Sequence, residues 1–384
     1  MIEDVQAAVA QRSDLAGGIL ILDECCEDKR GKHSAGVKRQ YNGRHQQVED
    51  CQVGVYLTYG KGSIWSWIDG DLYLPQDWFS PAYAQRRLKA EIPPERRFQT
   101  KIELGWQMIQ QAQAAGIPFE AVTFDSAYGD DHVLRDQCRA ANIEYYADVR
   151  SSLQIYLSPP EVVRPPNQQG KLPAHHRILS PWTVTVKDIA QDPNILWQRL
   201  VLPPDERGLL EANFARCPVW MVRADGQVVA DTLLLRRDSR EFVTYSLTNA
   251  APDTPLLTLA QRKSQRYFIE RANQDAKSEF AWDEFQSLKY RAWEHHLAFT
   301  ILSSWFIAET RLDWQLEHPR DPTLLDDYAT DVLPPLSVAN VREMLRATLP
   351  LPQLSSEQAA LLVVKHLDNR TRSRSSRLKH RFKP

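Results

Sequence analysis

Short apolar runs, separated by polar or turn-forming residues, recur through the first 150 positions. Residues 18–23 form a continuous apolar run that ends in Asp23, which is typical of a buried strand. Residues 51–59 and 63–74 alternate between apolar and polar positions, with the turn Gly60-Lys61-Gly62 between them. The three segments therefore predict an antiparallel meander joined by a loop and a tight turn.

Helical spacing begins after the meander, over residues 101–115, and Gly116-Ile117-Pro118 ends it. A second apolar run, residues 121–125, ends in Asp125. A predicted helix (131–141) and another strand (144–149) complete the order β-β-β-α-β-α-β, which indicates an α/β fold.

The pattern changes after residue 150. Residues 151–255 contain Pro-rich turns and short β-like pieces, which predict an inserted β-rich subdomain. Helical patterns resume over 259–274 and 290–310. A Pro-punctuated, partly helical stretch follows at 322–352.

Composition excludes several classes of protein. The 384 residues are 43% hydrophobic and 25% charged, which is ordinary for a globular protein and rules out a collagen-like or wholly disordered chain. The sequence contains no run of eighteen apolar residues, so no membrane span is predicted. The acidic N-terminus lacks the apolar region of a secretory signal. The five cysteines are odd in number and have no CxxC spacing. We therefore expect a reducing, cytoplasmic location without zinc, with Cys25 and Cys26 as strand-end packing or, alternatively, a reactive pair.

The formal net charge of −2 conceals two cationic segments. Residues 29–46 carry six basic side chains and no acidic one: Lys29, Arg30, Lys32, Lys38, Arg39 and Arg44. Residues 370–384 carry seven basic side chains, again with no acidic one. Cationic runs of this kind neutralise nucleic-acid phosphates, and a solvated loop and tail are the alternative interpretation.

Asp23 and Asp125 occupy equivalent positions, each at the end of an apolar run. Neighbouring strands would bring the two carboxylates together at one sheet edge, which is costly unless a cation lies between them. Mg²⁺ or Mn²⁺ suits oxygen ligands. With Glu270 as a third carboxylate, two ions could flank a phosphate. Capping of turns by the two aspartates is the alternative.

Glu270 lies in a predicted helix between two cationic side chains. Arg266 precedes it by four residues and Lys277 follows it by seven, so all three share one helix face. The pattern fits a carboxylate for metal and two cations for phosphate. It fits an ordinary solvated salt bridge equally well.

The ordered motifs resemble bacterial insertion-sequence transposases of the DDE class. They are most similar to the insertion-sequence family numbered 701, within the insertion-sequence-4-like superfamily. The segments that carry the resemblance span about residues 17–310 and include 21–24, 29–32, 39–41, 51–55, 74–78, 123–129 and 266–270 with Lys277.

The resemblance implies a ribonuclease-H-like catalytic core, a mixed sheet flanked by helices and interrupted by the β-rich insertion. On this view residues 1–150 are the first part of the core, 151–255 the insertion, 256–312 the part of the core that carries Glu270, 313–369 a helical region, and 370–384 a basic tail expected to be disordered.

The resemblance also implies residue roles. Asp23, Asp125 and Glu270 would be the catalytic carboxylates that hold two Mg²⁺ or Mn²⁺ ions. Arg266 and Lys277 match the Arg and Lys of the superfamily's Tyr-Arg-Glu-Lys signature, which contacts phosphate, while Lys263 stands where the signature has Tyr. The basic residues of 29–46 would hold DNA as well.

We therefore expect a DNA transposase that cleaves transposon ends and joins the 3′-hydroxyl to target DNA, self-associates on DNA, and works in the bacterial cytoplasm and nucleoid without an organic cofactor. The alternatives are a non-catalytic DNA-binding remnant and a nuclease of the same fold that does not join ends. Family members carry a longer region before the first catalytic strand, so we expect this chain to be short at its N-terminus. Related enzymes use a Trp of the insertion to receive a flipped base; for Trp182, Trp197 and Trp220 we expect core packing instead.

Overall fold

The computed structural model describes residues 1–29, 31–43, 45–163, 176–179, 182–205, 208–238, 241–317, 336–348 and most of 355–368. The chain divides into two compact units, Met1–Pro334 and Pro335–Pro384. None of the described helices is long and apolar enough to cross a membrane.

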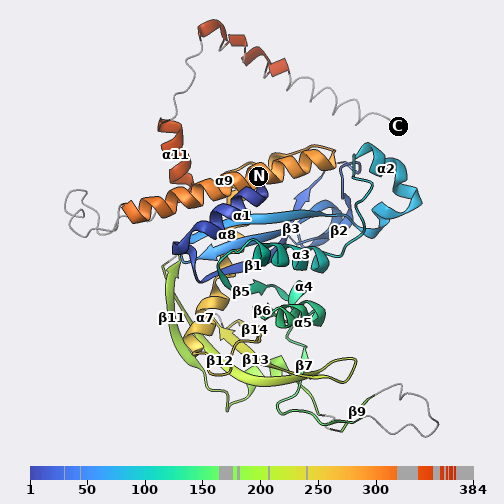
Figure 1. Cartoon of the computed structure of the whole chain (residues 1–384), viewed down its shortest axis with the longest axis vertical. Coiled ribbons are helices and arrows are strands. Elements are labelled where there is room, and N and C mark those ends of the chain that lie inside the picture. Colours follow the sequence, from blue (N-terminus) through green and yellow to red (C-terminus); the bar gives the residue numbers. More distant parts are fainter. Residues whose placement is uncertain are drawn as a thin grey trace. The chain divides into compact units, whose positions relative to one another are not determined.

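The first unit is built on a large mixed sheet (Figure 1). Its described strands follow the order β11-β12-β13-β14-β6-β5-β1-β3-β2, and β4 also pairs with β3. The core strands are β1 (Gly18–Asp28), β2 (Lys38–Asn42), β3 (Gln47–Lys61), β4 (Ile64–Tyr73), β5 (Phe119–Phe124) and β6 (Glu144–Asp148).

Strand directions confirm the predicted core. β1, β3 and β4 are antiparallel neighbours, as the meander requires. β5 lies parallel to β1, and β6 lies parallel to β5. An antiparallel meander extended by two parallel strands, with helices on both faces, is the mixed sheet of a ribonuclease-H-like core.

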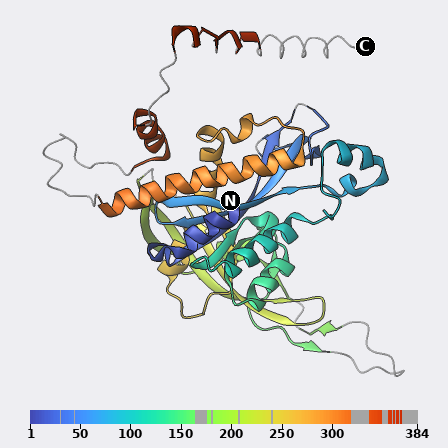
Figure 2. The same ribbon diagram turned by 45° about the horizontal axis from the view of Figure 1, so that its top comes forward.

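Helices cover both faces of the sheet. Gly105 of α3 packs against Leu22 of β1 so closely that a Cβ there would lie 2.5 Å from the Leu22 Cδ2. Phe268 of α8 lies near Gly60, as does Ile21. Because successive strand residues point to opposite faces, α3 and α8 cover opposite sides of β1. Figure 2 shows the long helix α9 running across the α8 side, where it packs on α1 and β4.

The helices of the first unit are α1 (Ile2–Gln11), α2 (Ala84–Lys89), α3 (Lys101–Ala114), α4 (Ser126–Gly129), α5 (His132–Ala140), α6 (Val186–Gln191), α7 (Leu256–Ser264), α8 (Tyr267–Ser278) and α9 (Tyr290–Glu317). The predicted helix over 259–274 is interrupted, because α7 ends in a tight turn at residues 265–266 before α8 begins. α1 and β2 were not predicted. β2 is a polar edge strand, and such a strand lacks the apolar alternation that the prediction relied on.

The inserted segment is β-rich, as expected, and its long strands continue the core sheet. They are β11 (Gln198–Asp205), β12 (Gly208–Val222), β13 (Val228–Arg237) and β14 (Val243–Thr248). β14 pairs antiparallel with β6 and so joins the insertion to the core. Four two-residue strands accompany them: β7 (Gln154–Ile155), β8 (Val162–Val163), β9 (Arg177–Ile178) and β10 (Val184–Thr185).

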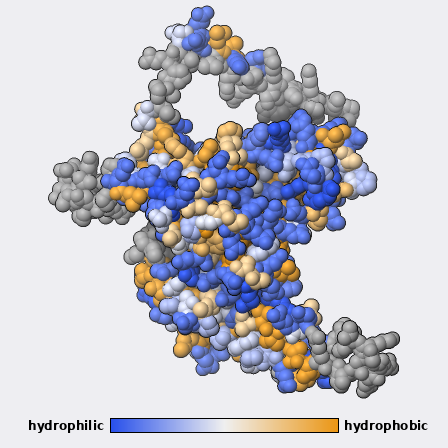
Figure 3. Space-filling view, viewed as in Figure 1, coloured by the Kyte–Doolittle hydropathy of each residue, from blue (hydrophilic) through white to orange (hydrophobic). Residues whose placement is uncertain are grey.

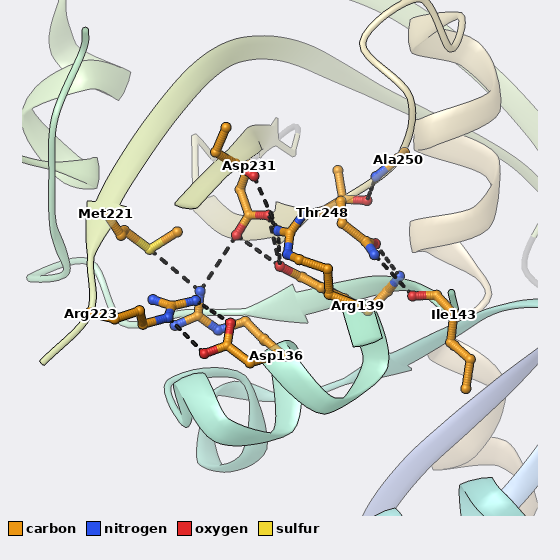
Figure 4. A network of polar contacts seen from close by, with 12 residues as sticks. Asp136, Arg139, Ile143, Met221, Arg223, Asp231, Thr248 and Ala250 are labelled. Carbon is orange, nitrogen blue, oxygen red and sulfur yellow. Dashed lines mark hydrogen bonds and ion pairs between the residues drawn. The ribbon is translucent and has the colours of Figure 1, made fainter. Parts of the chain in front are cut away.

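A buried ionic network holds the insertion against α5 (Figure 4). Asp231 of β13 accepts hydrogen bonds from Arg139 of α5 and from the Tyr145 hydroxyl at 2.7 Å, and Arg135 lies 3.6 Å from it. Arg223, the residue after β12, donates two 2.7 Å hydrogen bonds to Asp136. Such charges are tolerated inside a protein because each is paired.

In the second unit, α11 (Val338–Thr348) buries Val338 and Val341. Residues 322–335 of the predicted Pro-punctuated stretch and the basic tail at 370–384 lie outside the described residues.

Candidate active site

Asp23 and Asp125 lie side by side on adjacent strands. Leu22 pairs with Phe124 in the parallel β1–β5 ladder, and each aspartate is the next residue of its chain. Asp125 follows the end of β5 as predicted, but β1 continues to Asp28. Asp23 therefore sits where pairing to β5 stops, and not at the end of the strand, because β3 pairs with β1 over its whole length.

In each of the two carboxylates, one oxygen accepts hydrogen bonds from backbone amides and the other accepts none from the described residues. The Asp23 Oδ1 accepts from the Glu24 amide at 2.8 Å. The Asp125 Oδ1 accepts from the amides of Ala127 and Tyr128, so Asp125 also caps α4. No described residue donates a hydrogen bond to either Oδ2, which leaves two oxygen ligands on one sheet edge.

Electrostatics favour a cation at this edge. Burial, opposed by the charge of Arg266 and reinforced by the charge of Asp125, raises the pKa of Asp23 to about 7. Two like charges this close are stabilised by a divalent cation with oxygen ligands. The residues present therefore fit Mg²⁺ or Mn²⁺.

Two tryptophans of β4 fix α8 over the sheet. The Trp65 indole donates to Asp275 at 2.9 Å and stacks on Phe268, and the Trp67 indole donates to Asn273 at 3.1 Å. All three partners belong to α8, so the helix that carries Glu270 has a defined position beside β1.

Arg266 lies at the start of α8 among several carboxylates. Burial lowers its pKa, but the opposing effect is larger and the net pKa is raised; the carboxylates responsible are Asp23, Asp148, Asp125 and Glu270. Glu270 itself is exposed. The structure thus brings Asp23 and Asp125 together directly. Glu270 is related to them through Arg266, whose pKa all three carboxylates raise. The three do not form a closed set of ligand atoms among the described residues.

Asp148, which the sequence reasoning missed, ends the next parallel strand. Ala147 pairs with Phe124, so Asp148, the last residue of β6, is the next residue after a paired position, as Asp125 is on the neighbouring segment. Its carboxylate contacts the Lys263 ammonium at 2.9 Å, and the Arg266 Nε lies 3.6 Å away. The sequence did contain a signal for Asp148, because this residue is a third carboxylate at the end of a short predicted strand.

Lys277 lies farther along the same face of α8. Its charge lowers the pKa of both Cys25 and Glu27 against the larger effect of burial, which raises both. Cys25 and Glu27 share the face of β1 with Asp23. α8 therefore follows β1, with Arg266 near Asp23 and Lys277 near Glu27, in agreement with the one helix face expected from the spacing.

The basic segment 29–46 is not one continuous cationic surface. Lys29 is buried and donates to the Phe285 carbonyl at 2.7 Å, so we do not retain it among the proposed phosphate contacts. Lys38 pairs with Asp77 at 2.6 Å, and Lys32 lies 3.8 Å from Asp50. Arg39 is exposed on β2. Arg30 and Arg44 lie outside the described residues.

A second group of potential ligands is formed by the end of β1 and the β2–β3 hairpin. Ligand atoms of Asp28, His45 and Glu49 lie within 4.8 Å of one another. Asn42 donates to both carboxylates, and His45 contacts Glu49 at 2.6 Å. These contacts already satisfy the group in part.

The three tryptophans of the insertion differ in environment. Trp182 is 88% exposed, so the expected core packing is wrong for it. Trp197 is half-buried under the Arg237 guanidinium, which lies 4.4 Å from its ring. Trp220 is half-buried where its backbone pairs with Tyr156.

Hydrophilic side chains cover most of the face shown in Figure 3, including the region around α2. α2 contributes Arg86, Arg87 and Lys89 to this surface.

Comparison with known proteins agrees with this geometry. The family model described as "DDE superfamily endonuclease" matches residues 2–202. The chain is 23% identical over 279 residues to a protein of Microchaete diplosiphon named "Probable transposase for insertion sequence element IS701". The match spans 71% of this chain and 60% of the relative's length.

Proposed function

The chain belongs to the DDE superfamily endonucleases, and on this premise we propose that it is a transposase that cleaves DNA at transposon ends and joins the freed 3′-hydroxyl to target DNA. The observation that carries the proposal is the adjacent pair Asp23 and Asp125, which has Arg266 beside it. The similarity to a probable transposase supports the same reaction.

We assign metal binding to Asp23, Asp125 and Glu270. Two bound Mg²⁺ ions would supply activation of the attacking hydroxyl and stabilisation of the leaving oxygen. The chain's own contribution is to hold the carboxylates in place. Backbone amides of Glu24, Ala127 and Tyr128 hold one oxygen of each aspartate, and the other oxygen of each would be the metal ligand.

Arg266 and Lys277 would bind DNA phosphates from α8. Their cationic side chains lie along β1 on the face that carries Asp23, so a DNA strand following this face would meet both. Further contacts would come from Arg39 and Lys38 of β2 and from Lys32, which precedes that strand. Paired transposon ends imply self-association on DNA, and such an enzyme would act in the bacterial cytoplasm, at the nucleoid.

Product analysis tests the proposal. The protein is incubated with Mg²⁺, target plasmid and a duplex that carries the terminal repeats of its own element. We expect cleaved ends and covalently joined products. Cleaved ends without joining would identify a nuclease of the same fold, and binding without cleavage would identify a non-catalytic remnant.

A further inference from the structure

The Arg266 guanidinium has no hydrogen-bond partner among the described residues. Its Nε is buried without a partner, and Asp148, 3.6 Å away, lies beyond hydrogen-bond distance. A guanidinium carries five N–H donors, and a buried donor without a partner, as the Arg266 Nε is, is costly. An anionic ligand would remove that cost.

Asp148 is the carboxylate that would compete for this guanidinium, and it is already satisfied. The Ser246 hydroxyl donates to its Oδ1 at 2.6 Å. The Lys263 ammonium lies 2.9 Å from the same oxygen and donates to the Oδ2 at 3.0 Å. Asp148 thus has a full unit of opposing charge without Arg266.

Lys263 is placed by the fold for this contact. It lies in the last turn of α7, is 8% exposed, and has its ammonium 2.9 Å from the Asp148 carboxylate. The tight turn at residues 265–266 then directs the next cation, Arg266, toward the same carboxylate from a greater distance. Asp148 therefore has two cationic neighbours at different distances: Lys263 in direct contact at 2.9 Å and Arg266 at 3.6 Å.

We propose that Asp148 is a positioning residue for Arg266, and that Lys263 neutralises Asp148 so that Arg266 keeps its donors for the DNA phosphate. This inference rests on the proposed function. It assigns a role to the position where Lys263 replaces the Tyr of the related signature.

Removing Lys263 should redirect Arg266. In Lys263→Met, Arg266 would be the only cation of the described residues within 4.0 Å of the partly buried Asp148 carboxylate. It should form direct hydrogen bonds to that carboxylate, because an unpaired charge away from solvent is strongly unfavourable. Arg266 would then no longer be available to bind the DNA phosphate. Neutralising Asp148 in the same protein removes the competitor.

The experiment is a double-mutant cycle on the full chain, measured as the single-turnover cleavage rate of end DNA. We expect a loss of about thirtyfold or more for Lys263→Met, but about fivefold for Asp148→Asn, whose Arg266 is merely less well anchored. The double variant should cleave at the rate of Asp148→Asn, and Lys263→Arg should retain near-native activity. A double variant as slow as Lys263→Met, or slower, would overturn the proposal.

A crystal structure of Lys263→Met separates this inference from the proposed function, because it needs no activity. We expect the Arg266 guanidinium within about 3 Å of Asp148. Should Arg266 keep its present position, the proposed competition does not occur. If Lys263→Met does not fold, the structure of Asp148→Asn decides: Arg266 should lose its fixed position, and an unchanged position would contradict the role of Asp148.

Discussion

Burial raises the pKa of Asp23 against the opposing charge of Arg266, and the charge of Asp125 adds to the rise, because Asp23 and Asp125 follow paired positions on adjacent parallel strands. This repulsion predicts a strong response to divalent cations. We expect Mg²⁺ to raise the melting temperature of the protein, since binding to the folded state stabilises it, and Asp125→Asn to abolish most of that shift.

Asparagine is the suitable substitution, because it keeps an oxygen that can cap α4. Asp131 offers a matched control, since it caps α5 through the amides of Val133 and Leu134 in the same way but lies outside the site. Asp131→Asn should keep the full Mg²⁺ shift. Equal shifts in both variants would argue against Asp125 as a ligand.

Gly129 sets the distance between α4 and β6. A Cβ at this position would lie 1.9 Å from the Asp148 carbonyl oxygen, so Gly129→Ala must push the two segments apart. We expect a loss of about 1–3 kcal/mol in the free energy of unfolding and a reduced cleavage rate, measured by urea denaturation and by nicking. Gly31→Ala, with no atom within 4 Å of its new Cβ, should change neither.

Asp231 holds the insertion to α5 through buried charges. Asp231→Asn leaves Arg135, which is 2% exposed, without a counterion, and should cost about 3–5 kcal/mol in the free energy of unfolding. Asp130→Asn breaks an ion pair with the exposed Arg150 and should cost less than about 1 kcal/mol. Similar losses in chemical denaturation would show that the buried network does not stabilise the fold.

Asp69 predicts how stability depends on pH. Burial raises its pKa to about 7 in the folded protein, above the value of about 3.9 for an unfolded chain. The folded state therefore binds the proton more tightly, and the resulting stability is complete below about pH 4 and is lost as pH rises through 7.

Asp69→Asn removes this titration. Relative to the native protein, the variant should gain stability between pH 4 and pH 8, by at most about 4 kcal/mol. Urea unfolding at several pH values measures the difference. Glu3→Gln, an exposed change on α1, should show no such trend, and a pH-independent difference for Asp69→Asn would refute the prediction.

The strands that carry the site could be predicted from local sequence. Apolar runs ending in Asp23 and Asp125 indicate buried strands, and the order of strands and helices indicates a mixed sheet. The pairing of Leu22 with Phe124 confirms that this pattern brings the aspartates together. The spacing of Arg266, Glu270 and Lys277 indicated one helix face, and the family resemblance implied their roles in metal and phosphate binding.

Contacts between distant segments could not be predicted in this way. Asp148 and Lys263 are 115 residues apart, and nothing in the local pattern of either indicates the pair. The same holds for β14, which joins the insertion to β6 through Ser246 and Asp148. Lys29 is buried against Phe285, which is 256 residues away in the sequence. The basic run alone could not show this burial, so the sequence suggested a phosphate contact for Lys29.

The location of the metal centre is the central claim, and one nicking assay tests it against the second group of possible ligands. Mg²⁺-dependent cleavage of end DNA is measured for Asp23→Asn, Asp125→Asn, Glu270→Gln and, as the matched alternative, Asp28→Asn. We predict that each of the first three substitutions lowers the rate by at least about a hundredfold, while Asp28→Asn leaves it within about threefold. Loss of cleavage in Asp28→Asn, with activity retained in Asp125→Asn, would contradict the account.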